Sequence, residues 1–171
     1  RDLSINIEPL HRFCLNATIW WIVDWQMNIL DTCLKISQLS ETVGYTIQAI
    51  HVPKTVDNDL PITDNCPGFG SVAKYIAVST REASFDVASM AKTSTKVFIL
   101  EVMGRHAGWI AAAGGLASTE DCEIPIVILF PEITFDKKKF LAKTDRLVKK
   151  FGYCSVVVSE GVKNAKGKFL A

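Results

Sequence analysis

Residues 96–103 read KVFILEVM, a mostly apolar run that ends abruptly at Gly104 and Arg105. A continuous apolar run without polar alternation is typical of a strand that is covered on both faces, as the strands of parallel sheets are. Small apolar residues follow at 107–117, which suits a helix that packs closely against a sheet. The stretch therefore predicts a strand, a polar turn and a covering helix, which together form the repeating unit of an α/β fold.

The same alternation of strand and helix extends in both directions along the chain. Further strands are expected at residues 45–52, 124–130 and 154–159, and further helices at 31–43, 69–92 and 136–151. The apolar residues of the helices recur near the 3.6-residue period, and the lysines of the last helix lie on its solvent-exposed face. Four apolar strands separated by helices predict a doubly wound parallel sheet with helices on both faces.

Composition restricts the class of protein. A chain of 171 residues with 49% hydrophobic residues is long enough for one well-filled core. A formal net charge of +1 offers no basic field, so no nucleic-acid partner is expected. The apolar residues 17–23 are too few to cross a bilayer, so no membrane partner is expected either. The five cysteines include no Cys-x-x-Cys pair, which favours neither disulfides nor zinc and makes the reducing cytoplasm the expected location.

Polar side chains follow three of the expected strands. The sequence PKTVDNDL occupies residues 53–60, directly after the first strand, while Arg105 and Glu160 follow the second and the last. Right-handed crossovers bring the carboxyl ends of parallel strands to one edge of the sheet, where α/β proteins bind their ligands. Asp57, Arg105 and Glu160 are therefore expected to meet at that edge.

The loop at 53–60 has the side chains that phosphoryl transfer needs. One aspartate can accept a proton from a hydroxyl nucleophile, a second can hold Mg²⁺ near phosphate oxygens, and a lysine can neutralise charge that develops during transfer. The alternative is an ordinary solvated turn, because Asp, Asn and Pro are common turn residues. On the spacing of these residues alone, the solvated turn is the favoured interpretation.

Two motifs favour the enzyme. PKTVDND at residues 53–59 resembles the central signature of the phosphofructokinase family, and MGRHAG at 103–108 resembles the family's second signature in order and approximate spacing. The likeness runs from about Asp31 to the C-terminus and implies a phosphofructokinase-like fold, of which this chain would be the incomplete central part. The first motif contains a lysine, Lys54, and in this form it is most similar to the motif of the pyrophosphate-dependent members.

This resemblance implies a glycolytic reaction, phosphoryl transfer from pyrophosphate to the 1-hydroxyl of fructose 6-phosphate, with Mg²⁺ as cofactor. At the matching motif positions, Asp57 is the general base, Asp59 a metal ligand and Thr55 a hydroxyl that contacts the sugar or the transferred group. Arg105 stabilises charge on the transferring phosphoryl group. Lys54 stands where the commonest ATP-dependent pattern has Gly, and it neutralises a compact inorganic donor.

Further positions of the sugar-phosphate pocket follow from the same likeness. Met103 and Gly104 lie against the sugar, and Glu160 accepts hydrogen bonds from sugar hydroxyls. Lys96 reaches the 6-phosphate across a subunit interface, which implies a homo-oligomer, either a dimer or a tetramer. The alternatives are strand-end packing for Met103 and Gly104 and a solvated strand-start lysine for Lys96. His106 is given no role in the reaction.

The first thirty residues depart from the family pattern. Where phosphofructokinases carry a Gly-Gly-Asp segment that approaches phosphate, residues 27–30 read MNIL, whose side chains would block that approach. Residues 1–30 are therefore expected to be an atypical segment, and residues 31–171 a phosphofructokinase-like domain. The abrupt change predicts a fragment or a start from a disturbed reading frame, with other pocket segments lying outside the chain.

Three functions stay open at this point. The first is the pyrophosphate-dependent transferase. The second is an ATP-dependent 6-phosphofructokinase, because some ATP-dependent relatives also carry lysine at the position of Lys54. The third is an inactive fragment, or a non-catalytic subunit that binds sugar phosphate or pairs with a full-length partner. Residues 27–30 favour the third function, whereas Asp57 and Arg105 favour descent from a catalyst.

Overall fold

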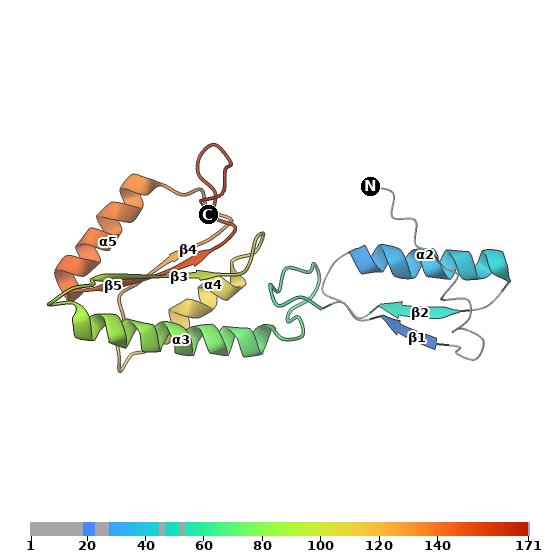
Figure 1. Ribbon diagram of the computed structural model, residues 1–171, viewed down its shortest axis with the longest axis horizontal. Helices are drawn as coiled ribbons and strands as arrows, with labels where there is room; N and C mark the ends of the chain where they lie inside the picture. The colour runs from blue at the N-terminus through green and yellow to red at the C-terminus, as the bar shows by residue number, and fades with distance from the viewer. Residues whose placement is uncertain (1–18, 23–27, 45–46, 52–53, 171) are drawn as a thin grey trace. The chain divides into compact units, whose positions relative to one another are not determined.

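The computed structural model describes residues 19–22, 28–44, 47–51 and 54–170 (Figure 1). The chain divides into two compact units, residues 1–54 and 55–171. Met27, the first residue of the MNIL segment, lies outside the described residues. No helix in the described part of the chain is long and apolar enough to cross a membrane.

The first unit contains a parallel pair of strands with a helix between them in sequence. Strand β1 (Ile19–Ile22) pairs with β2 (Gln48–His51), and α2 (Asn28–Val43) packs against β2. Gly44, at φ 71°, ends α2 in the left-handed conformation that glycine adopts most readily. The helix and β2 confirm the expected elements within a few residues.

Strand β1 was not expected from the sequence. Its four residues read IWWI, a β-branched and aromatic composition that suits a strand. The strand is too short to show a period of its own, so only its pairing with β2 reveals it. Trp20 and Trp21 therefore belong to the sheet of the first unit.

The second unit contains a three-stranded parallel sheet in the order β3-β5-β4 (Figure 1). Its strands are β3 (Val97–Val102), β4 (Ile126–Leu129) and β5 (Cys154–Ser159). The register pairs Val102 of β3 with Ser159 of β5. Because β5 lies in the centre, five of its six residues are buried.

Helices cover both faces of this sheet, with α3 and α4 on one face and α5 on the other (Figure 1). Three helices and one 3₁₀ turn make up these layers: α3 (Phe69–Met90), α4 (Trp109–Ala113), η2 (Gly114–Ala117) and α5 (Lys137–Phe151). Alternate residues of β5 point to opposite faces: Val157 packs with Ile110 of α4, whereas Val156 packs in the cluster under α5. The predicted parallel sheet with helices on both faces is confirmed for three of the four expected strands, whereas the fourth, β2, pairs with β1 in a sheet of its own.

Two helices differ in detail from their expected form. The helix expected at 107–117 is short and tightens into the 3₁₀ turn η2 at Gly114. A Cβ on Gly114 would lie 2.7 Å from Cγ2 of Val157, so glycine lets this turn touch the central strand. Helix α5 begins after Asp136, whose Oδ1 accepts hydrogen bonds from Lys138 N and Lys139 N at 2.9 and 3.1 Å.

The lysines of α5 are exposed, as predicted. Phe140, Leu147 and Val148 pack against the core from the opposite side of the helix. The spacing of Leu141 places it in the same apolar stripe, but 53% of its surface is exposed. Its position at the edge of the stripe turns it away from the sheet.

Candidate active site

The loop after β2 is held in shape by Asn58. This residue adopts a left-handed conformation, with φ 56°, which Asn tolerates better than most side chains do. Its buried amide accepts a hydrogen bond from Cys66 N at 2.7 Å and donates one to the carbonyl oxygen of Asp64 at 3.3 Å. The chain therefore turns sharply between Asp57 and Asp59, and the turn is closed by the Asn58 side chain.

Asp57 is half-buried at the start of this turn. Its backbone N–H donates to Thr55 Oγ1 at 3.2 Å. Its carboxylate oxygen Oδ1 is buried and has no hydrogen-bond partner among the described residues. A buried carboxylate oxygen without a partner is costly in a folded protein, and it is free to accept a proton or to contact a ligand.

Four side chains lie near enough to Asp57 to change its pKa. Burial contributes most and raises the pKa, and the negative charges of Asp59 and Glu160 raise it further. The positive charges of Arg105 and His106 act in the opposite direction and lower it. The structure therefore brings together Asp57, Arg105 and Glu160, which come from three separate loops.

Neighbouring strands carry two of these loops. Glu160 follows β5, and its backbone N–H donates to Val102 O of β3 at 2.9 Å. Arg105 follows Gly104, whose φ of 119° is in the region that favours glycine. A Cβ on Gly104 would also collide with the carbonyl oxygen of Ala107, so the turn before Arg105 requires glycine. The parallel register thus places Arg105 and Glu160 side by side at one sheet edge.

The other predicted site residues are placed differently. Thr55 is half-buried beside Asp57, Gly104 is buried, and Met103 is 54% exposed. Lys54 is half-buried at the last position of the first unit. Lys96 is exposed and precedes β3, so the length of the strand, roughly 20 Å, separates it from Arg105. Lys96 does not join the site within this chain.

The sequence did not predict that three further residues belong to the site. His106 lies close enough to lower the pKa of Asp57. Glu132, after β4, accepts a hydrogen bond from Gly108 N at 2.8 Å and so holds the far end of the Arg105 loop. Ser159 contacts the same loop from β5. The one signal in the sequence was Ser159 itself, a polar residue that ends an apolar strand directly before Glu160.

The residues present fit a magnesium ion that is held jointly with a substrate. No group of three or more His, Cys, Asp or Glu side chains in the described part of the chain could hold a metal by itself. Magnesium is usually bound by one or two carboxylates together with substrate phosphates and water. The exposed carboxylate of Asp59 is a suitable ligand of this kind.

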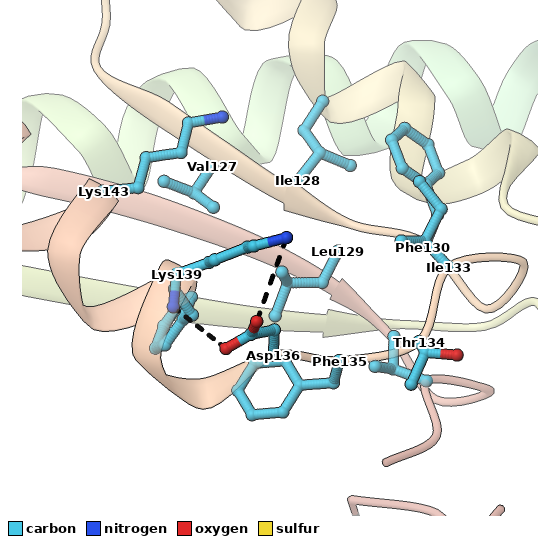
Figure 2. Close-up of a pocket in the computed structure, with 12 residues that line it drawn as sticks. Val127, Ile128, Leu129, Phe130, Ile133, Thr134, Phe135, Asp136, Lys139 and Lys143 are labelled. Carbon is cyan, nitrogen blue, oxygen red and sulfur yellow. Dashed lines mark hydrogen bonds and ion pairs between the residues drawn. The ribbon is translucent and has the colours of Figure 1, made fainter. Parts of the chain in front are cut away.

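A hollow of about 200 Å³ lies elsewhere in the second unit, beside β4 and α5 (Figure 2). Its wall is mostly apolar and includes Val127, Leu129 and Phe140. The carboxylate of Asp136 caps α5 and also faces Lys139, with 4.0 Å between Oδ2 and Nζ. None of the residues predicted for catalysis or binding lines this hollow, so the candidate site is the cluster of loops around Asp57.

The raised pKa of Asp57 predicts a cost in stability. A carboxyl group whose pKa is raised above its ordinary value of 3.8 stabilises the fold when protonated, and this contribution is lost as the pH rises through the folded-state pKa. Asp57→Asn should therefore raise the Tm at neutral pH, and the difference should vanish below pH 3.8. Thermal unfolding in EDTA across this range, with the exposed Asp64→Asn as control, measures the effect. Equal Tm values for parent and Asp57→Asn at neutral pH would contradict it.

Comparison with known proteins places these loops in a family. Residues 30–171 match the family described as Phosphofructokinase. A pyrophosphate–fructose 6-phosphate 1-phosphotransferase from Methylococcus capsulatus is 72% identical over 141 residues, which cover 82% of this chain and 34% of the relative. An ATP-dependent 6-phosphofructokinase 2 from Clostridium perfringens is 38% identical over 123 residues, which cover 71% of this chain and 31% of that protein.

The fold comparison agrees. The crystal structure of a pyrophosphate-dependent phosphofructokinase from Nitrosospira multiformis matches with a TM-score of 0.81 at 77% identity, over 88% of this chain and 38% of that one. The chain thus spans about a third of the length of the curated relatives it matches. Because the family match extends over residues 30–171 and includes both signatures, this chain belongs to the phosphofructokinase family.

Proposed function

We propose that this chain carries the catalytic loops of a cytoplasmic pyrophosphate-dependent 6-phosphofructokinase. The proposed reaction transfers a phosphoryl group from pyrophosphate to the 1-hydroxyl of fructose 6-phosphate and yields fructose 1,6-bisphosphate and phosphate. The observation that carries the proposal is that Asp57, whose buried Oδ1 has no hydrogen-bond partner among the described residues, lies near enough to Arg105 for the guanidinium to lower its pKa. The names of the pyrophosphate-dependent relatives support the choice of donor and acceptor.

Asp57 is the proposed general base. Its Oδ1 accepts the proton of the sugar's 1-hydroxyl. The hydroxyl oxygen forms a bond to one phosphorus of pyrophosphate, and the bond between that phosphorus and the bridging oxygen breaks, so that phosphate leaves. A raised pKa makes the ionised carboxylate a stronger base. Thr55 holds the loop by accepting the backbone N–H of Asp57, and its hydroxyl hydrogen can point to the sugar or the transferred group.

Positive side chains stabilise the transferring group. The guanidinium of Arg105 presents several N–H donors in a plane that matches phosphate oxygens. Mg²⁺, when bound by Asp59 and the donor, would neutralise charge on the donor phosphates. Glu160, half-buried beside Asp57, is proposed to accept hydrogen bonds from sugar hydroxyls, and Met103 and Gly104 to lie against the sugar.

A full-length background is needed for the test, because the chain spans a third of its relatives. In a full-length chimera, residues 30–171 replace the matching segment of the Methylococcus capsulatus relative. We expect turnover of fructose 6-phosphate with pyrophosphate and Mg²⁺. Calorimetric binding of fructose 6-phosphate without any turnover would instead support a non-catalytic sugar-phosphate-binding subunit.

Lys54 is the proposed determinant of the donor. An ammonium group neutralises compact pyrophosphate but crowds a nucleotide, so Lys54→Gly in the chimera should lower kcat/KM for pyrophosphate by about 10- to 100-fold. The same variant should raise the ratio of ATP to pyrophosphate activity. Lys54→Met is the control, because it removes the charge but keeps the bulk, and should lose pyrophosphate activity without gaining ATP activity. An unchanged donor ratio in Lys54→Gly would leave the ATP-dependent alternative standing.

A homo-oligomer, dimer or tetramer, completes the proposal. Lys96 lies at the opposite end of β3 from Arg105, so a contact between Lys96 and the 6-phosphate has to be made in the site of a second copy. Sedimentation of the chimera measures the state. An active monomer would remove the role of Lys96.

A further inference from the structure

Ser159 occupies the junction between the two loops that carry Arg105 and Glu160. It is the last residue of the central strand β5 and is only 1% exposed. Its hydroxyl donates a hydrogen bond to the carbonyl oxygen of Gly104 at 2.5 Å and accepts one from Gly161 N at 3.1 Å. One buried hydroxyl therefore binds the residue before Arg105 and the residue after Glu160.

Gly161 brings the same two loops into direct contact. A Cβ on Gly161 would lie 2.9 Å from the Cα of Arg105 and closer still to its carbonyl group, so the two backbones touch. Glu160 is fixed from the other side as well, because its N–H donates to Val102 O of β3. The three residues 159–161 thus hold Arg105 and Glu160 at a set separation.

We propose that Ser159 is a positioning residue that aligns the Arg105 guanidinium with the Glu160 carboxylate across the substrate. This inference rests on the phosphofructokinase function proposed above. Phosphoryl transfer depends on placing donor and acceptor within a fraction of an ångström, and a misplacement of 1 Å can cost about 100-fold in rate. Without the hydroxyl, Gly104 O and Gly161 N lose their shared partner, and both loops become free to separate.

The matched control lies in the same strand. Ser155 of β5 is also fully buried, and its Oγ lies 2.7 Å from Ser84 Oγ of α3, in the core and not in the site. Ser155→Ala removes an equally buried hydroxyl from the strand roughly 13 Å away. A loss that is merely structural should therefore affect both variants, whereas a loss of alignment should affect only Ser159→Ala.

We expect Ser159→Ala in the full-length chimera to lower kcat about 10- to 100-fold, while Ser155→Ala stays within a few-fold of the parent. Ser159→Thr and Ser159→Val form a second pair of variants. Their side chains have nearly the same shape, and only threonine has the hydroxyl group. This pair tests the proposal even if Ser159→Ala fails to fold. The Thr variant should retain at least about tenfold more kcat than the Val variant. Equal kcat within either pair would overturn the proposal.

Hydrogen exchange separates this inference from the proposed function. In the 171-residue chain, amides at 103–108 should exchange severalfold faster in Ser159→Ala than in Ser155→Ala, because opening of the loop no longer breaks a buried hydrogen bond. An inactive parent chimera with this exchange difference would refute the function but keep Ser159 as the residue that aligns the loops. An active parent with unchanged exchange would refute the role of Ser159 alone.

Discussion

Asp57→Asn in the full-length chimera should lower kcat by about 10²–10⁴-fold, the range that a positioned general base contributes. The amide has nearly the shape of the carboxylate and preserves the turn that Asn58 closes, but it cannot take the proton of the 1-hydroxyl. The KM for fructose 6-phosphate should change little, because proton transfer matters in the transition state and not in the bound substrate.

The pH profile provides a second reading of Asp57. In the parent, kcat/KM should rise with pH through the raised pKa of Asp57, since the ionised form is the active base. In Asp57→Asn, this rise of kcat/KM with pH on the acidic side of the profile (the acidic limb) should disappear, and kcat should fall. Asp64→Asn changes an exposed carboxylate of the same loop and should keep both. An Asp57→Asn variant within tenfold of the parent would rule out this base.

Arg105→Ala should lower kcat by about 10²–10³-fold, as the loss of a donor to a transition-state charge does in other enzymes. Arg105→Lys should recover only part of this loss, because an ammonium group keeps the charge but not the planar fork of donors. Arg146→Ala removes an exposed arginine from α5 and serves as the control.

Loss of Arg105 should also move the pH profile in a known direction. The positive charge of Arg105 lowers the pKa of Asp57, so its removal should shift the acidic limb of kcat/KM to higher pH. A limb that stays in place, or moves to lower pH, would show that the two side chains do not share one electrostatic environment. The assignment of phosphoryl transfer would then lose its physical basis.

Local patterns were sufficient for most of the secondary structure. The strands at 97–102 and 154–159 are mostly apolar runs, and the helix at 137–151 has one apolar stripe and a capping aspartate. Each of these signals arises within the segment itself. The pairing of β1 does not: four residues are too few for a pattern, and only the partner strand shows that they form part of a sheet.

The site was predictable to the extent that topology dictates it. A parallel sheet brings the carboxyl ends of its strands to one edge, so the sequence alone predicts that residues following different strands, such as Arg105 and Glu160, lie together. The roles given to these residues remain predictions that the substitutions above test. Lys96 precedes its strand and so lies at the opposite end of β3 from these residues.

The order of residues along the chain was enough to establish the α/β class, the two signatures and the edge at which charged side chains collect, because these depend on local pattern and on general rules of chain connection. The strand order β3-β5-β4, the orphaned Oδ1 of Asp57 and the hydroxyl of Ser159 between two loops were decided by tertiary structure alone. Each depends on contacts between residues far apart in the chain, and a contact of that kind leaves no periodic trace in either segment.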